Sequence, residues 1–175
     1  LSRARSGNQI PAPRQSSRTD YERRLDVILV TIGVYTDRLD DAHAHAVRWL
    51  EKDYNDDPFN VATVASANGI ALTGANQLVE ARKSMVIAHS YIAQANSDHG
   101  TAWVNLLSSM IVLREGDYVR AHQDLPDTLA RARAALGDAT GITGTISLLA
   151  AKSAVELNLN DEARDRLAIG LRKAH

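Results

Sequence analysis

Cysteine is absent from this chain of 175 residues, which excludes structural disulfides and thiolate metal sites. Long apolar runs are also absent, since no stretch reaches the roughly 18 residues that a membrane-spanning helix requires. Neither sign of charge predominates, because 20 Lys and Arg residues are balanced by 21 Asp and Glu residues. The net charge of −1 gives no general attraction to nucleic acid or to an anionic membrane, so we expect direct binding to neither.

Aromatic residues are scarce: the chain has only eight, of which one is phenylalanine. Alanine by contrast occurs 27 times, and 45% of all residues are hydrophobic. Alanine is the best helix former, and small side chains let helices approach one another closely. The composition therefore predicts closely packed helices rather than sheets, and the length suits one domain.

The chain also lacks targeting signals. It contains neither a signal-peptide pattern nor an Asn-x-Ser/Thr sequon, and it starts Leu1-Ser2-Arg3 without an initiator methionine. We expect a cytoplasmic location, and we expect the chain to be an excised part of a longer protein.

Residues 1–18 differ from the rest in composition. They are polar, contain Gly7, Pro11 and Pro13, and hold four arginines but no acidic residue. This pattern predicts a flexible linker or a disordered end, with a basic arm that contacts nucleic acid as the alternative. Residues 19–175 would then form the folded helical-repeat domain.

Apolar residues recur at helical spacing through almost all of this domain. The apolar positions fall into eight segments, at 25–32, 39–50, 61–72, 78–95, 103–113, 118–136, 146–157 and 163–174. In the first segment, Leu25, Ile28, Leu29 and Ile32 form the apolar face. Glycine, asparagine, aspartate and proline separate the segments, and these residues end helices or cap the next one. The pattern predicts eight helices in four hairpins.

A short signature marks the tight turn of each predicted hairpin: a turn residue opens it, and an alanine follows five positions later. The four copies are Asp37–Ala42, Asn76–Ala81, Gly116–Ala121 and Asn158–Ala163. Their alanines are 39, 40 and 42 residues apart, which predicts a helical solenoid. The predicted fold is thus an all-α, TPR-like superhelix of about four antiparallel helix pairs with a period of about 40 residues. An ordinary up-down helical bundle is the alternative.

Two positions make specific structural demands. The alanine of each signature should lie one turn into the second helix and face its partner helix, where a larger side chain would push the pair apart. Pro126 lies within the sixth predicted helix, where it removes a backbone hydrogen bond and clashes with the preceding turn. We therefore expect a bend or an interruption near Leu125.

Motifs for catalysis and cofactor binding are missing. The pairs Lys83-Ser84 and Lys152-Ser153 lack the glycines of a phosphate-binding loop, and no Gly-x-Ser-x-Gly elbow occurs. We therefore predict no enzymatic activity and no cofactor. An α-helical enzyme would require polar residues converging in a deep pocket, and no such grouping is evident.

Metal binding is not predicted either. Asp40, Asp41, His43 and His45 form the densest group of possible ligands, but residues two apart on a helix point in different directions. Asp41 and His45 could share an ion, although a solvated polar face is the preferred interpretation. His89 lies on an apolar stripe and is interpreted as a hydrogen-bonded core or groove residue.

Stacked helix pairs usually form a concave face lined by the first helix of each pair. The polar residues on the predicted first helices are therefore candidates for a ligand groove, namely Asn68, Asn105, Ser109 and Ser147. Asn105 and Ser109 are four residues apart and share a helix face. A buried amide needs hydrogen-bond partners, so the alternative for Asn68 is a bond to a neighbouring helix.

Short motifs between Asp53 and Lys173 carry a resemblance to a known family. They are Asp57-Pro-Phe-Asn60, Gly74 with Leu78-Val-Glu-Ala81, Ala102-Trp103, Arg114-Glu-Gly-Asp117, Ala134-Ala-Leu-Gly137, and Ala150 to Leu157 followed by Asp161-Glu-Ala163. Together they resemble the helical-repeat region of the large LuxR-type ATP-dependent transcription activators, the MalT-like group.

The resemblance implies a place in a larger protein. In that family a STAND-type ATPase module precedes the repeats and a LuxR-type helix-turn-helix follows them, while the repeats take part in inducer sensing and self-association. This chain resembles only the middle part, so it would be a sensor and protein-interaction module of a transcription regulator, with a protein or a small-molecule inducer as its partner. The alternative is a stand-alone TPR-like adaptor that holds a peptide or protein in its concave groove.

Overall fold

The computed structural model describes residues 18–51, 57–138 and 140–173, and eight helices occupy these ranges. They are α1 (Arg18–Tyr35), α2 (Leu39–Leu50), α3 (Pro58–Gly74), α4 (Leu78–Ala95), α5 (Asp98–Arg114), α6 (Tyr118–Leu136), α7 (Gly141–Glu156) and α8 (Asn160–Lys173). The linker predicted for residues 1–18 lies outside the described residues except for Arg18, where α1 begins. None of the described helices is long and apolar enough to cross a membrane.

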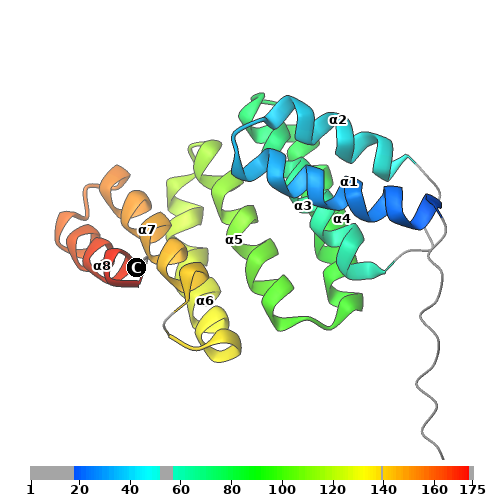
Figure 1. The fold of residues 1–175 in the computed structure, drawn as a ribbon. Helices are drawn as coiled ribbons and strands as arrows, with labels where there is room; N and C mark the ends of the chain where they lie inside the picture. Colours follow the sequence, from blue (N-terminus) through cyan, green and yellow to red (C-terminus); the bar gives the residue numbers. More distant parts are fainter. Residues whose placement is uncertain (1–17, 52–56, 139, 174–175) are drawn as a thin grey trace, which may run out of the picture.

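Consecutive helices pack against each other in antiparallel fashion, and the pairs follow one another along the molecule (Figure 1). The first helices α1, α3, α5 and α7 also pack on one another in succession. The second helices do not, because no backbone contact joins α2 to α4, α4 to α6 or α6 to α8 in the described ranges. The two ends do not meet either, so the arrangement is an open series of helix pairs rather than a closed bundle.

The four predicted turns share one backbone geometry. Their opening residues all have positive φ, at 58° for Asp37, 59° for Asn76, 80° for Gly116 and 60° for Asn158. In each turn the next residue donates its N–H to a carbonyl five positions back, for example from Gln77 to Leu72 at 2.8 Å. This is a Schellman ending, which Asn and Gly accept readily because they tolerate the left-handed conformation.

The signature alanines are buried as predicted: Ala42 and Ala81 are 0% exposed, Ala121 is 1% and Ala163 is 5%. The approach in the first pair is especially close. A Cβ added at Gly33 of α1 would lie 2.9 Å from the Cβ of Ala42. The glycine and the alanine together therefore set the spacing of α1 and α2.

Three apolar clusters join successive pairs. The first joins α1 and α2 to α3 through residues such as Val30, Trp49 and Val64. The second joins α3 and α4 to α5 and comprises Ala62, Ala65, Leu72, Ala81, Met85, Ala88, Ile92, Val104, Leu107 and Ile111. The third joins α5 and α6 to α7 and comprises Ala102, Leu106, Leu113, Ala121, Leu125, Leu129, Ala132, Ile142, Ile146 and Ala150. Each interface between pairs thus has its own core.

Two expectations need correction. Of the bend or interruption expected near Leu125, the interruption does not occur, because α6 continues through Pro126 as one helix. In α1 the helix buries Val30, with Val27 and Val34 packed beside it, whereas Leu25, Ile28 and Ile32 of the predicted apolar face are exposed. The sequence shows two apolar stripes on α1 at helical spacing, and the stripe of valines is the one that faces α3.

Candidate functional site

The four residues predicted for a ligand groove occupy different surroundings. Asn105 and Ser109 lie together at the floor of a groove between α4 and α6. Asn68 and Ser147 are not part of that groove: their side chains are 7% and 0% exposed, and both are engaged in bonds inside the fold.

Asn68 links three helices. Its Oδ1 lies 2.8 Å from Nδ1 of His43 on α2, and its Nδ2 donates to Ser84 Oγ on α4 at 3.1 Å. Ser84 in turn donates to the carbonyl of Ala65 at 2.9 Å. A buried amide is costly unless its polar atoms are satisfied. Asn68 therefore bonds neighbouring helices, which was the alternative interpretation of this residue.

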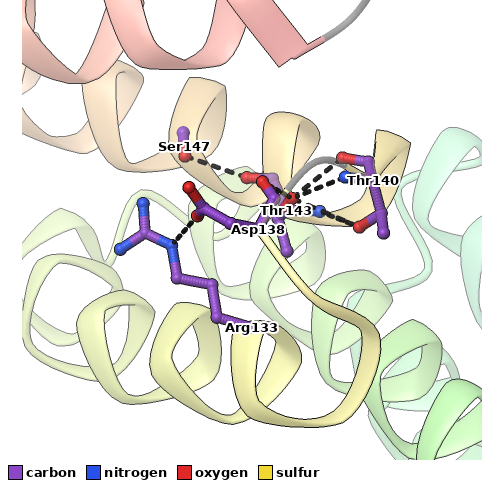
Figure 2. Close-up of polar contacts among 5 residues, drawn as sticks. All are labelled: Arg133, Asp138, Thr140, Thr143 and Ser147. Carbon is purple, nitrogen blue, oxygen red and sulfur yellow. Dashed lines mark hydrogen bonds and ion pairs between the residues drawn. The ribbon is translucent and has the colours of Figure 1, made fainter.

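Ser147 belongs to the junction between α6 and α7 (Figure 2). It donates to the carbonyl of Thr143, and Thr143 and Thr140 form a capping box at the start of α7. Thr143 Oγ1 also donates toward the carbonyls of Asp138 and Thr140, at 3.1 and 2.9 Å. Beside this network the Nε of Arg133 lies 2.8 Å from Oδ1 of Asp138. These bonds fix the path of the chain from one pair to the next.

The groove has α4 and α6 as its walls and α5 as its floor, because α4 and α6 both pack on α5 but not on each other. Its deeper polar part has a volume of about 260 Å³. The polar and charged side chains that line it are His89 from α4, Asn105, Ser108 and Ser109 from α5, and Arg120, Asp124, Asp127, Thr128 and Arg131 from α6. The α6 residues recur at helical spacing, so one face of that helix supplies a stripe of both charges.

A second hollow of about 280 Å³ adjoins the first and shares His89, Ser108 and Arg120 with it. Its lining is more apolar, with Met85, Val86, Ile111 and Val112. The groove therefore offers a polar end and an apolar end side by side. Ligand sites in proteins commonly combine apolar walls with a few placed polar groups.

An ion pair closes the apolar end. Arg82 of α4 donates through Nε and Nη2 to the two carboxylate oxygens of Glu115, which follows α5, at 2.5 and 2.6 Å. The hydrogen bond and the charge of Glu115 raise the pKa of Arg82, so the guanidinium stays charged. This bidentate pair joins the second and third helix pairs at the rim of the groove.

His89 lies between the two hollows, where its Nε2 is 2.8 Å from Ser108 Oγ. This agrees with its interpretation as a hydrogen-bonded groove residue. Partial burial lowers the pKa of His89 below its ordinary value of 6.5. The neutral ring is therefore favoured in the folded protein, which suits the hydrogen bond between Nε2 and Ser108.

A pH dependence of stability follows from His89. Because its pKa is lower in the folded state, the unfolded chain binds the proton more readily, and the free energy of unfolding should fall as the pH drops below about 6.5. Urea titrations between about pH 7.5 and pH 5.5 should show a smaller fall in the free energy of unfolding for His89→Gln than for the native protein. All other side chains are common to both proteins, so the difference between the two falls reports on His89. Equal falls would contradict the prediction.

The remaining histidines do not converge. His43 bonds Asn68, and Nδ1 of His45 lies 3.0 Å from Oδ1 of Asp26. His45 is thus paired with Asp26, and not with Asp41 as a ligand of one shared ion. No group of three or more His, Asp or Glu side chains within the described part of the chain is arranged to hold a metal ion.

A separate hollow of about 290 Å³ lies on the face of the first helices and escaped the sequence analysis. Its walls include Tyr35 at the end of α1, Phe59 at the start of α3 and Trp103 on α5. The rings of Tyr35 and Trp103 are tilted, with centroids 6.0 Å apart. We call this set, together with His99, the aromatic hollow. The clue in the sequence was the scarcity of aromatics, since three of the eight gather here.

Comparisons with known proteins identify no relative. No protein-family model matches the chain, and no curated protein matches it. The groove and the aromatic hollow must therefore be interpreted from their own geometry.

Proposed function

We propose that this domain is a sensor and protein-interaction module, which binds an inducer or a partner segment in the groove between α4 and α6. It binds its ligand without transforming it. One observation carries the proposal: the two walls of the groove, α4 and α6, belong to different helix pairs, and these two helices make no direct backbone contact with each other.

This geometry couples binding to shape. A ligand that contacts His89 on α4 and Arg131 on α6 connects the second pair to the third. It would favour the relative angle of the pairs at which both sets of contacts form. Binding then shifts the population of conformations by as much as the affinities for them differ. Such a shift is what a module needs in order to pass a signal to neighbouring parts of a protein.

The larger protein in this proposal is a bacterial transcription regulator of the type the sequence resembles. The repeat module would change the state of flanking ATPase and DNA-binding modules, and the domain alone would neither hydrolyse ATP nor bind a defined DNA site. Robust ATP turnover by the purified domain would contradict this assignment. The flanking sequence of the parent gene decides between a regulator and a stand-alone adaptor.

The groove can be tested with a thermal-shift screen of amino acids, dicarboxylates, sugar phosphates and arrayed peptides. A compound that binds only the native state raises the melting temperature by mass action. Calorimetric titration of each hit should then give about tenfold weaker binding, or about 1.4 kcal/mol, to Arg131→Ala than to the native protein. Arg131 lines the polar end and is exposed, so its truncation should leave the fold intact.

Arg164→Ala is the matched control for this titration, since Arg164 is an exposed arginine on α8, outside the residues that line the groove. Its affinity should equal that of the native protein. If every hit binds Arg131→Ala as tightly as the native protein, the groove is not the binding site.

The aromatic hollow supports a second candidate, the peptide-binding adaptor. Aromatic side chains provide large contact areas, and they dominate the binding energy at many protein interfaces. A peptide whose binding is lost in Trp103→Ala but retained in Arg131→Ala would favour the adaptor. The reverse pattern would favour the sensor.

A further inference from the structure

The outer face of α1 carries an exposed apolar stripe. Its members are Tyr21 at 66% exposure, Leu25 at 41%, Ile28 at 53% and Ile32 at 42%, and the stripe ends at Tyr35, which is 68% exposed and also forms a wall of the aromatic hollow. They are spaced by three or four residues, so they form one continuous face along the helix. We call Leu25, Ile28 and Ile32, the central part of this stripe, the α1 face.

The repeat shows what this face corresponds to inside the array. Counting back from the positive-φ turn residues, Leu25 is equivalent to Val64, Val104 and Ile146. Those three residues are 0%, 2% and 0% exposed. The same position is therefore buried in α3, α5 and α7 and exposed only in α1.

The neighbouring positions follow the same rule. Ile28 is equivalent to Ala67, Leu107 and Leu149, of which the first two are buried and the third is partly buried. Ile32 is equivalent to Ala71, Ile111 and Ser153, which are all buried. Two of the three positions are hydrophobic in every copy, which is what a conserved packing role in the repeat would require.

At the position of Leu25 the other three copies pack in a cluster with the preceding helix pair. Val64 lies in the cluster formed with α1 and α2, Val104 in the cluster with α3 and α4, and Ile146 in the cluster with α5 and α6. The α1 face thus corresponds to surfaces of α3, α5 and α7 that a preceding helix pair covers. Nothing in the described part of the chain covers it.

The opposite end of the molecule exposes the complementary surface. Counting from the signature alanines, Leu167 of α8 is equivalent to Ala46, Met85 and Leu125. These three are buried in the three clusters, where each packs toward the next pair, whereas Leu167 is 46% exposed. Leu171, one turn further on, is 51% exposed. We call Leu167 and Leu171 the α8 face.

We propose that the α1 face of one molecule docks on the α8 face of a second copy, which continues the array from one chain into the next. The second copy is the occupant because this chain itself provides the surface that covers positions equivalent to the α1 face. Both faces are apolar, and the residues equivalent to Leu25 and Leu167 at the junctions within the array pack in shared clusters. This association is independent of ligand binding in the groove.

The geometry of the contact has a distinctive consequence. The two faces lie at opposite ends and differ in structure, so the contact is head-to-tail and leaves one free face of each kind on every oligomer. Association should therefore form a series of chains of increasing length rather than stop at a dimer. The contact repeats the packing of successive pairs, so each contact between two molecules should resemble the interface between two pairs of one molecule.

Sedimentation velocity over a concentration series provides the test. The native protein should show oligomers that grow with concentration. The variant Ile28→Glu/Ile32→Glu, with charge on the α1 face, and the variant Leu167→Glu/Leu171→Glu, with charge on the α8 face, should each associate at least about tenfold more weakly. An equimolar mixture of the two variants should form a one-to-one dimer and nothing larger, because only one competent face of each kind remains.

Val79→Glu/Val119→Glu is the matched control, since these residues of α4 and α6 are 63% and 56% exposed but lie away from both ends. It should associate like the native protein, and circular dichroism should show native helix content in all variants. A native protein that stays monomeric at every concentration would overturn the proposal. So would dimers of the Leu167→Glu/Leu171→Glu variant alone, which would mean that α1 faces pair with each other, or loss of association in the control.

Discussion

The variant Trp49→Ala is expected to lose about 3–5 kcal/mol of the free energy of unfolding. Trp49 is the largest of the fully buried side chains, at 1% exposure, and lies at the end of α2. It fills the space between the first pair and α3 beside Val30 and Val64, and its Nε1 donates to the carbonyl of Arg23 at 3.3 Å. Truncation would remove apolar contacts, leave a cavity and break the hydrogen bond to Arg23 at once.

The loss should be local as well as large. Repeat arrays are stabilised by each unit and by the contacts between neighbours, so a defect at one junction chiefly weakens the units that share it. Hydrogen exchange should show the greatest loss of protection in α1 and α2 and little change in α7 and α8. Urea titration followed by circular dichroism measures the total loss in the free energy of unfolding. The control is Val86→Ala at a 68% exposed position, which should change this free energy by less than about 0.5 kcal/mol. A loss below about 1 kcal/mol in Trp49→Ala would contradict the packing described for the first junction.

The variant Leu125→Ala should lose about 3–5 kcal/mol, for a related reason at the other end of the array. Leu125 is 0% exposed and lies in the third cluster, where α5 and α6 meet α7. It immediately precedes Pro126, which supplies no N–H for the backbone ladder of α6. At this point α6 depends on side-chain packing more than elsewhere. Local adjustment of the helix should therefore do little to fill the cavity that Leu125→Ala leaves.

Hydrogen exchange distinguishes this variant from Trp49→Ala. Protection should fall first in α6, α7 and α8, while α1 and α2 keep native values. Val119→Ala is the control on the same helix, since Val119 is 56% exposed and should tolerate truncation with little change in stability. Uniform loss of protection over all helices would show that the domain unfolds as one unit, which would contradict the local character expected of both variants.

The sequence predicted the helix pairs well because their determinants are local. Asp37, Asn76, Gly116 and Asn158 were assigned as turn residues from their type and spacing, and each has the positive φ that such a turn requires. The signature alanines were predictable for the same reason, since a position one turn after a tight turn must face the partner helix.

What was not predictable depended on contacts between pairs. Asn105 and Ser109 lie on a groove, but on its α5 floor between the second helices, and not on the face formed by the first helices. Ser147 is a polar residue on a first helix, as Asn105 and Ser109 are, yet its neighbours cover it completely. Spacing along one helix defines its faces but not which neighbour covers each face, and this is also why the α1 face was interpreted incorrectly.

The contact pattern of the two rows of helices has a mechanical consequence. Packing runs unbroken along α1, α3, α5 and α7, whereas no backbone contact joins α2 to α4, α4 to α6 or α6 to α8 in the described ranges. The row of first helices should therefore behave as an elastic rod that resists stretching and compression. The gaps on the other side can widen or narrow without losing a backbone contact, so bending toward or away from that side should be the softest deformation of the molecule.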